Sequence, residues 1–276
     1  MSFDCLESLK ECLASIDKQS GVRFEIIVLD NASKDGTRDF LKTYQTKSIL
    51  SDKNIGFGAG VNRAAEIATG KYLFIANPDI VLPENALRYL CEKAEKLGEF
   101  GLISPLLVHP DGSMQLSARN YPGRLDFLFG RGSPLFKLGL SAEKSAGYLI
   151  PTGEDPVQVP AISATAIFIV KELFVRLGGF DKRFFMYLED LDLCRRLRDR
   201  GLSIWLLPSL RVVHSWRKSS QTRPYFALYC HHLSVYRYFR KYFPAQWFNN
   251  SLLGVALVIG FIVSSLLKMT GKGIRN

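Results

Sequence analysis

The sequence predicts an α/β fold in which helices cover both faces of a mostly parallel sheet. Two observations lead to this prediction. Short apolar runs, typical of buried strands, alternate with segments whose apolar residues recur every three or four positions. Polar turns follow two of the apolar runs, at 30–36 and at 77–79. The alternation is typical of parallel sheets, in which ligands collect at the carboxyl ends of the strands.

The first half of the chain supplies the alternating elements in order. A helix is expected over 6–16, because apolar positions recur at helical spacing at Leu6, Leu9 and Leu13. The apolar run that follows predicts a buried strand over 24–29. The same patterns then predict helices over 37–44, 58–68 and 84–97, with strands over 48–50, 72–75 and 102–106.

The second half begins without periodicity. Gly and Pro are frequent between residues 109 and 160, which predicts long loops suited to an acceptor pocket or a lid. A strand over 161–170, a helix from Lys171 and a glycine turn over 178–181 follow. A second helix opens at Glu189, and Gly201 is a plausible cap for its end. Strands over 204–207 and 211–214 precede a basic tail.

Three carboxylates crowd the start of an otherwise apolar and basic helix: Glu189, Asp190 and Asp192. Like charges beside apolar side chains require a cation, a polar substrate or the helix N-terminus to compensate them. Adjacent helical residues point about 100° apart, so one of Glu189 and Asp190 should act while the other braces it. Asp190 is the candidate base for an acceptor hydroxyl, with Arg195 or Arg196 holding the charges in place. Capping alone is the alternative interpretation, since acidic residues are common in first helical turns.

A second polar cluster ends the strand over 72–75, where Asn77 and Asp79 flank Pro78. One carboxylate and one carboxamide oxygen suit Mg²⁺ or Mn²⁺ that is shared with substrate phosphates. A solvated turn is the alternative. His214 ends a later strand, where a single histidine is more often structural, but with Asp79 it would form a mixed metal site.

A glycine-rich segment over 54–62 invites a dinucleotide-binding interpretation. The required G-x-G-x-x-G spacing would place its third glycine at Val61, so the match fails. These glycines are better explained by close approach of the backbone to a nucleotide or diphosphate at the start of the following helix.

The bulk composition favours a globular protein with an anionic partner. The chain has 276 residues, 47% hydrophobic content and a net charge of +10. Lys and Arg are dense over 195–200, 211–223 and 237–241, the last interleaved with aromatic residues. That mixture suits a lipid headgroup layer. Nucleic acid is not expected as a partner, because no DNA- or RNA-binding motif is present.

Two further features bear on location. The five cysteines have no C-x-x-C spacing, which argues against a zinc site or a disulfide framework and favours a reducing cytoplasm. Residues 251–267 carry no charge, yet 17 residues are at the lower limit for crossing a bilayer. Spanning, re-entrant, surface-lying and buried-core interpretations of this segment stay open.

The blocks in their order resemble the family 2 inverting glycosyltransferases, and the rhamnosyltransferase-like branch most. The resemblance extends over residues 4–245 and rests on the motifs at 24–37, 54–58, 77–79, 178–181 and 185–196, with Asn62 and His214. It implies a GT-A fold that is Rossmann-like, a nucleotide-diphosphate sugar donor, a divalent metal and a single-displacement transfer.

By motif, the resemblance also implies roles for individual residues. Asp190 would be the base, Asp79 would hold the metal and His214 would help it. The donor-binding residues would be Asp30, Asn31, Ser33 and Asp35 on the nucleotide, Asn54, Gly56 and Asn62 on its diphosphate or sugar side, and Asn77. Asn77 stands where the family's metal motif usually has an Asp, which implies weak or substrate-dependent metal binding.

We therefore expect a GT-A domain over 1–245, with the family's first strand missing, and a membrane-associated tail over 246–276. The leading hypothesis is transfer of a rhamnose-like deoxyhexose or a hexose to a glycan or lipid-linked acceptor in cell-surface polysaccharide synthesis. The enzyme would act at the cytoplasmic face of the membrane, either peripherally or through one C-terminal membrane segment. The alternatives are a non-catalytic, membrane-associated relative that binds nucleotide sugar or serves as a scaffold, and a nucleotidyltransferase.

Overall fold

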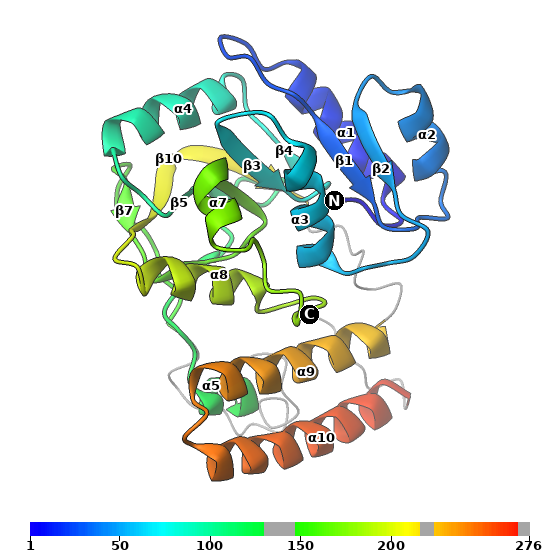
Figure 1. The fold of residues 1–276 in the computed structure, drawn as a ribbon, viewed down its shortest axis with the longest axis vertical. Helices are drawn as coiled ribbons and strands as arrows, with labels where there is room; N and C mark the ends of the chain where they lie inside the picture. Colours follow the sequence, from blue (N-terminus) through cyan, green and yellow to red (C-terminus); the bar gives the residue numbers. More distant parts are fainter. Residues whose placement is uncertain (130–146, 216–223, 270–276) are drawn as a thin grey trace.

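A six-stranded sheet forms the centre of the molecule (Figure 1). The computed structural model describes residues 1–129, 147–215 and 224–269. Part of the predicted acceptor loops, 130–146, and part of the basic segment, 216–223, lie outside these ranges. The strand order is β3-β9-β5-β10-β4, with β7 paired to β10 beside this path. The strands are β3 (Tyr72–Ala76), β4 (Ile80–Val81), β5 (Leu102–Val108), β7 (Val157–Gln158), β9 (Ala166–Val170) and β10 (Ile204–His214).

The strand directions correct one part of the predicted fold, because the sheet is mixed where a mostly parallel one was expected. Strands β5 and β10 are parallel, but β9 pairs antiparallel with both β3 and β5. Strands β3, β5 and β10 therefore share one direction, and β9 lies between two of them in the opposite direction. The alternation of helices and strands in the first half cannot reveal this, because β9 enters from the irregular second half.

Two small sheets flank the central one. Strands β1 (Ile27–Asp30) and β2 (Lys47–Leu50) form a parallel ribbon. Ser2 lies beside β1 in parallel: its amide donates to Leu29 O at 2.8 Å, and its carbonyl accepts from Asn31 N at 2.8 Å. Strands β6 (Ala118–Arg119) and β8 (Ala161–Ile162) form an antiparallel pair within the region predicted to be loops.

Helices cover both faces of the central sheet, as predicted. Neighbouring residues of one strand point to opposite faces, so Leu102 and Leu106 of β5 join one core while Ile103 and Leu107 join the other. The first core includes α3 (Phe57–Ile67), α7 (Lys171–Arg176) and α8 (Glu189–Arg198). The second includes α4 (Ala86–Leu97) and Cys12 of α1 (Leu6–Asp17). Helix α2 (Thr37–Thr43) packs beside the β1–β2 ribbon.

Two long helices form a separate layer below α8, which we call the foot (Figure 1). The foot consists of α9 (Pro224–Tyr242) and α10 (Trp247–Met269), with the short helix α5 (Arg124–Phe129) beside them. Val235 of α9 and Leu253 of α10 belong to the same apolar core as α8. Within the described ranges, one segment is long and apolar enough to cross a membrane, Trp247–Leu266.

Two predicted strand assignments differ in detail from the structure. The strand expected over 161–170 is divided into β8 and β9, since residues 163–165 interrupt the pairing. The two strands expected at 204–207 and 211–214 are one, because β10 continues through a register shift between Leu207 and Arg211. Pro208 does not end this strand.

The turn that leads toward α8 is held by one side chain of α3. Asn62 Nδ2 donates to Phe180 O at 2.8 Å, and Asn62 Oδ1 accepts from Phe180 N at 2.8 Å. Gly178 and Gly179 both have positive φ, of 78° and 67°. A Cβ on Gly179 would collide with the Asn62 amide, whereas no heavy atom of the described residues lies near the corresponding position of Gly178.

We expect Gly179→Ala to be clearly more destabilising than Gly178→Ala. Both substitutions force a side chain into the left-handed region, at a cost of about 1 kcal/mol. Only the first also displaces Asn62, which should add about 1–3 kcal/mol. Urea unfolding of the two variants measures the difference, and equal free energies of unfolding would show that the Asn62 clamp contributes nothing.

Candidate active site

Antiparallel pairing of β4 with β10 brings together two of the predicted metal ligands. His214 is the register partner of Ile80, and Ser215 N donates to Asp79 O at 2.9 Å. This pairing places His214 Nε2 at 3.3 Å from Asp79 Oδ1. Both side chains are nearly buried, with exposed fractions of 11% and 12%. Residues that are 135 positions apart in the chain therefore meet at one end of the sheet.

Gln115 fixes the orientation of the His214 ring. The Gln115 amide nitrogen lies 2.6 Å from His214 O and 2.9 Å from His109 Nδ1. Its oxygen therefore faces His214 Nδ1, at 2.7 Å, and can accept a hydrogen bond from it. A histidine protonated on Nδ1 directs its Nε2 lone pair toward the Asp79 carboxylate, so a cation between them would relieve the repulsion. The chemistry of this donor set fits one divalent metal that is shared with substrate oxygens.

The predicted base, Asp190, has a partner that the sequence patterns did not suggest. Arg119 of β6 lies 3.8 Å from Asp190 Oδ2, measured from its Nη2. Both side chains are largely buried, at 20% and 15% exposure. Asp190 also caps its own helix, since Oδ1 accepts from Leu191 N at 2.8 Å. The guanidinium and the helix N-terminus both place positive charge beside the Asp190 side chain.

One extended segment connects the two centres. Gln115 contacts His214, and Arg119 contacts Asp190, only four residues further along the chain. Four residues of chain span at most about 14 Å between Cα atoms. One short segment therefore contacts both the predicted metal pair and the predicted base. The segment is held at its middle, where Ser163 N donates to Ser117 O at 3.1 Å.

Glu189, the predicted brace, is buried beside Asp190. Burial raises the pKa of Glu189 from 4.5 to about 8, and the neighbouring Asp190 carboxylate adds to the effect. Its Oε2 atom has no hydrogen-bond partner among the described residues. Glu189 is therefore a neutral carboxylic acid at neutral pH.

The backbone just before α8 is strained. Tyr187 and Leu188 have positive φ angles of 71° and 63°, which non-glycine residues adopt at a cost of about 1–2 kcal/mol each. Ser234 of α9 supports this turn, because its Oγ donates to Met186 O at 2.9 Å. The Tyr187 ring packs edge-on against His231, also on α9. The start of α8 thus rests on the foot.

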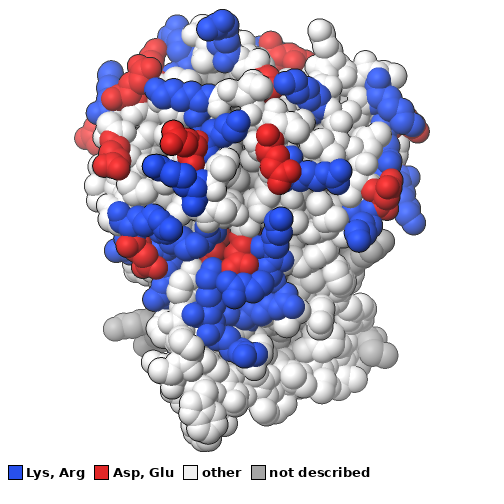
Figure 2. Space-filling view, viewed as in Figure 1, with Lys and Arg blue, Asp and Glu red and all other residues white. Residues whose placement is uncertain are grey.

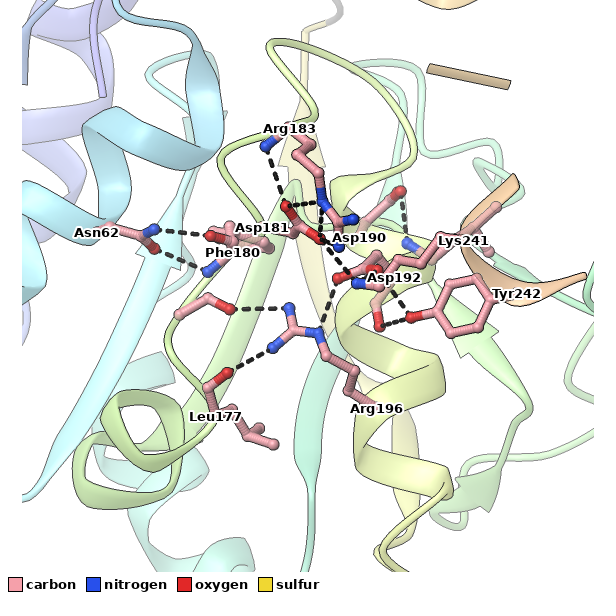
Figure 3. A network of polar contacts seen from close by, with 12 residues as sticks. Asn62, Leu177, Phe180, Asp181, Arg183, Asp190, Asp192, Arg196, Lys241 and Tyr242 are labelled. Carbon is pink, nitrogen blue, oxygen red and sulfur yellow. Dashed lines mark hydrogen bonds and ion pairs between the residues drawn. The ribbon is translucent and has the colours of Figure 1, made fainter. Parts of the chain in front are cut away.

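The third carboxylate of the acidic helix, Asp192, is structural (Figure 3). It is fully buried. Arg196 Nε donates to Asp192 Oδ2 at 2.7 Å, and Lys241 pairs with Asp192 Oδ1. The Tyr242 hydroxyl donates to the same oxygen at 2.7 Å. Arg196, one of the two predicted helpers, therefore neutralises Asp192, while Arg195 stacks on Tyr242.

The polar turn after β1 is ordered by its own side chains. Asp30 is fully buried, and its Oδ2 accepts from Ser33 N at 3.0 Å. Ser33 Oγ accepts from Asp4 N, and Asp35 caps α2 by accepting from Thr37 N at 3.1 Å. The four predicted nucleotide contacts thus share one turn at the end of β1, and three of them also shape it. Contact of these residues with a nucleotide stays a prediction.

The glycine-rich segment is tied to that turn. Asn31 Oδ1 accepts from Ile55 N at 2.8 Å, and Asn54 Oδ1 accepts from Gly56 N at 2.9 Å. Gly56 has φ of 86°, and a side chain there would collide with Phe185 O. Asn77 follows β3, and its backbone N–H donates to Thr165 O at 2.8 Å. The Asn62 carboxamide instead binds Phe180, so both of its polar atoms serve the fold.

Arg119 and Gln115 are the functional candidates that sequence reasoning missed. Both lie in the stretch 109–160, whose lack of periodicity predicted loops. A two-residue strand such as β6 has no periodic signal. Their contacts with Asp190 and His214 cross 71 and 99 positions of the chain. Only the folded structure reveals such pairs.

Comparisons with known proteins show what this chain is similar to. The family model described as Glycosyl transferase family 2 matches residues 2–129. The chain is 28% identical over 256 residues to the N-acetylglucosaminyl-diphospho-decaprenol L-rhamnosyltransferase of Mycobacterium tuberculosis, covering 87% of this chain and 82% of the relative. It is 26% identical over 246 residues to the rhamnosyltransferase WbbL of Escherichia coli, covering 86% and 89%.

Solved structures confirm the fold. A mannosyltransferase from Pyrobaculum calidifontis, in complex with GDP-Man and Mn²⁺, superposes with a TM-score of 0.56 and 18% identity, covering 98% of this chain and 77% of that one. GalNAc-T7 with UDP, GalNAc and Mn²⁺ gives a TM-score of 0.59 and 18% identity, covering 84% and 45%. The predicted GT-A-type α/β fold is therefore confirmed.

Glu189→Gln should remove a pH-dependent loss of stability. The folded state binds the Glu189 proton more tightly than the unfolded chain, so this stabilisation is complete below pH 4.5 and is lost as the pH rises through about 8. The amide cannot ionise. As the pH is raised from 5 to 8, the free energy of unfolding of the variant should therefore increase relative to that of the wild type by on the order of 2 kcal/mol.

Urea denaturation at the two pH values measures this difference. Glu99→Gln is the matched control, since Glu99 is exposed and should show no such change. A Glu189→Gln variant whose stability changes with pH in parallel with the wild type would contradict a neutral Glu189.

Proposed function

The chain belongs to the family 2 glycosyltransferases, and we propose that it transfers a rhamnose-like deoxyhexose from a nucleotide-diphosphate sugar to a lipid-linked acceptor, with inversion. The sugar and the acceptor rest on similarity to the two rhamnosyltransferases. The observation that carries the proposal is that one short segment, Gln115 to Arg119, contacts both Asp190 and the Asp79–His214 pair.

The proposed catalytic base is Asp190. Asp190 lies at the start of α8, where Arg119 and the helix N-terminus place positive charge beside it. It would take the proton from the acceptor hydroxyl as the oxygen attacks the anomeric carbon from the face opposite the diphosphate. Positioning of the reactants and stabilisation of the leaving group would supply most of the rate.

On the donor side, the β1 turn would hold the nucleotide and the 54–56 backbone would approach the diphosphate. Asp79 and His214 would hold Mg²⁺ or Mn²⁺ against the departing diphosphate, with Gln115 keeping the His214 ring in place. When bound, such an ion neutralises the charge that develops on the leaving group. Asn77 supplies no carboxylate, so the protein alone should hold the ion weakly and the donor phosphates should complete its coordination.

The proposed setting is the cytoplasmic face of the cell membrane. Two observations support it: all five cysteines are free thiols, and the foot carries the most apolar segment of the described chain. A lipid-linked acceptor would be presented at that surface. The product would be a glycan or lipid-linked saccharide for cell-surface polysaccharide synthesis.

One rival function is favoured by a specific residue. Asn77 in place of the usual Asp would suit a non-catalytic relative that binds nucleotide sugar without transferring it. The pairing of Asp190 with Arg119 argues for catalysis, because a protein that only binds nucleotide sugar or serves as a scaffold needs no largely buried carboxylate at this position. Purified wild-type chain that binds nucleotide sugar but neither transfers nor hydrolyses it would establish the rival. Release of pyrophosphate would indicate a nucleotidyltransferase.

Asp190→Asn should abolish transfer while leaving donor binding intact. Loss of a general base lowers the rate by about 10²–10⁴-fold, and the amide still fills the same space beside Arg119. Glu189→Gln is the control, since a neutral acid and an amide are similar, so its rate should stay within about tenfold of the wild type. A mass-spectrometric screen of nucleotide-deoxyhexose and nucleotide-hexose donors provides the assay. Near-normal turnover by Asp190→Asn would remove Asp190 as the base.

Removal of metal should stop transfer, and Mg²⁺ or Mn²⁺ should restore it. Asp79→Asn should raise the metal concentration needed for donor binding at least tenfold, and Gln115→Ala by about tenfold, because it orients the ligand His214. Calorimetric titration of nucleoside diphosphate at several metal concentrations measures both effects. Asp111→Asn, on an exposed turn, is the control. Donor binding that is unaffected by a chelator would exclude the metal role of this pair.

A further inference from the structure

We infer that the foot docks flat on an anionic lipid bilayer, with α10 lying in the plane of the interface and not crossing the membrane. This inference deepens the proposed function, on which it rests for the lipid-linked acceptor. It commits to one partner, a bilayer that contains acidic phospholipid, and to one orientation. Three features of the structure carry it: an apolar stripe on α10, the attachment of α9 to α8, and the basic residues around the stripe.

The outward face of α10 is a continuous apolar stripe. Its members are spaced three or four residues apart, with two adjacent pairs among them, and each is at least half exposed, from 52% to 70%. They are Trp247, Phe248, Leu252, Val255, Val258, Ile259, Ile262 and Leu266. So large an exposed apolar surface is rare on a protein that stays in water and marks a membrane or protein partner. Trp247 at one end is the residue type enriched at the headgroup level.

The opposite face of α10 packs on the protein. Asn250, Leu253 and Leu257 are buried. Asn250 Oδ1 accepts from Arg124 Nη2 of α5 at 2.7 Å. Although the sequence of α10 is apolar on nearly all sides, the structure thus divides it into a packed face and an open face. A bilayer-spanning helix would have lipid or another membrane helix around it.

Helix α10 runs antiparallel to α9 along its length (Figure 1). Tyr236 of α9 lies where a side chain on Gly254 would point, and His232 lies in the same way beside Gly260. Further along, the rings of Tyr229 and Phe261 meet edge-on at 6.5 Å. The two helices therefore share one plane, and α10 cannot enter the hydrocarbon without separating from α9 or taking it along.

Helix α9 cannot enter the bilayer together with α10, because side chains of α9 bind α8 and the turn before it. Lys241 pairs with the fully buried Asp192, and Tyr242 donates to the same carboxylate at 2.7 Å. Ser234 holds Met186 O at the start of α8. Taking α9 across a bilayer would bury Arg237, Arg240 and Lys241 in hydrocarbon, which is costly for charged side chains. The surface-lying interpretation of the tail is the one that agrees with these contacts.

Basic side chains border the apolar surface. Figure 2 shows Lys and Arg gathered in the middle of the visible face, above a lower part that is almost free of charge. Arg237 and Arg240 are exposed on α9, and Arg183 is 62% exposed nearby, where Arg237 donates to its carbonyl. An apolar face bordered by cations matches the acyl chains and acidic headgroups of a bilayer. A second copy of this chain, also with net charge +10, would be repelled.

The orientation also places the base. His231, on the inner side of α9, contacts the ring of Tyr187, which precedes α8. Docking the foot would therefore fix how the start of α8, with Asp190, is oriented relative to the headgroup layer. A lipid-linked acceptor would reach Asp190 from the side of the foot.

Vesicle co-sedimentation of the full chain tests the inference. The probe is vesicles of phosphatidylcholine with or without about 30% phosphatidylglycerol, free of donor and acceptor. We expect binding to the acidic vesicles to fall at least tenfold in the double variant Val258→Glu, Ile262→Glu. Val175→Glu, which adds a charge at an exposed apolar position of α7, should bind like the wild type. Vesicles without acidic lipid should bind more weakly, and high salt should remove the difference.

Extraction separates the two membrane orientations. Protein docked at the interface should be released from vesicles by alkaline carbonate, whereas a spanning helix would stay with the lipid. Retention after carbonate would overturn the in-plane orientation. Equal binding by the double variant and the wild type would overturn the role of the stripe. A dimer in solution that the double variant dissociates, without vesicle binding, would show that a second copy covers this face.

The experiment is independent of turnover. Because no sugar donor or acceptor is present, failure to bind vesicles would leave the transferase proposal standing with a soluble acceptor. Conversely, vesicle binding by a chain that transfers no sugar would refute the proposed function and leave the docking surface intact.

Discussion

The buried carboxylate of Asp192 is the constraint on which the rest of this structure depends. A fully buried charge is tolerated only when it is paired and hydrogen-bonded, and Asp192 is contacted by Arg196 from its own helix and by Lys241 and Tyr242 from α9. Removing one partner of such a pair typically costs about 3–5 kcal/mol. The catalytic helix and the foot are therefore locked together. Any force that orients the foot also orients the residues at the start of α8.

The site shows how neighbouring acidic residues acquire different roles. Glu189 is buried and keeps its proton, Asp190 pairs with Arg119, and Asp192 pairs with Lys241 of the foot. Sequence alone presents them as one cluster. Their division follows from which direction each side chain takes on the helix, since residues one and two positions apart point about 100° and 200° from one another.

Much of the fold follows from local patterns. The helices at 6–17, 57–67 and 86–97 and the strands at 72–76 and 102–108 agree closely with periodicity, because each element buries one face or one stripe. The antiparallel insertion of β9 was not predictable in this way, since strand order is set by pairing between distant segments. Asn62 illustrates the same limit within the site: its motif position implied donor contact, whereas its amide holds Phe180.

The sequence by itself determined the α/β class and the position of the acidic helix, and it predicted roles for Asp79, His214 and Asp190, because residue type and spacing carry that information. Only the tertiary structure decided that Arg119 contacts Asp190 and that Gln115 contacts His214. It also decided that one face of α10 is exposed while the other packs on the protein. The physical reason is the distance along the chain over which each interaction acts. Helix and strand preferences act over a few residues, whereas ion pairs, buried charges and exposed stripes depend on contacts between parts of the chain that only folding brings together.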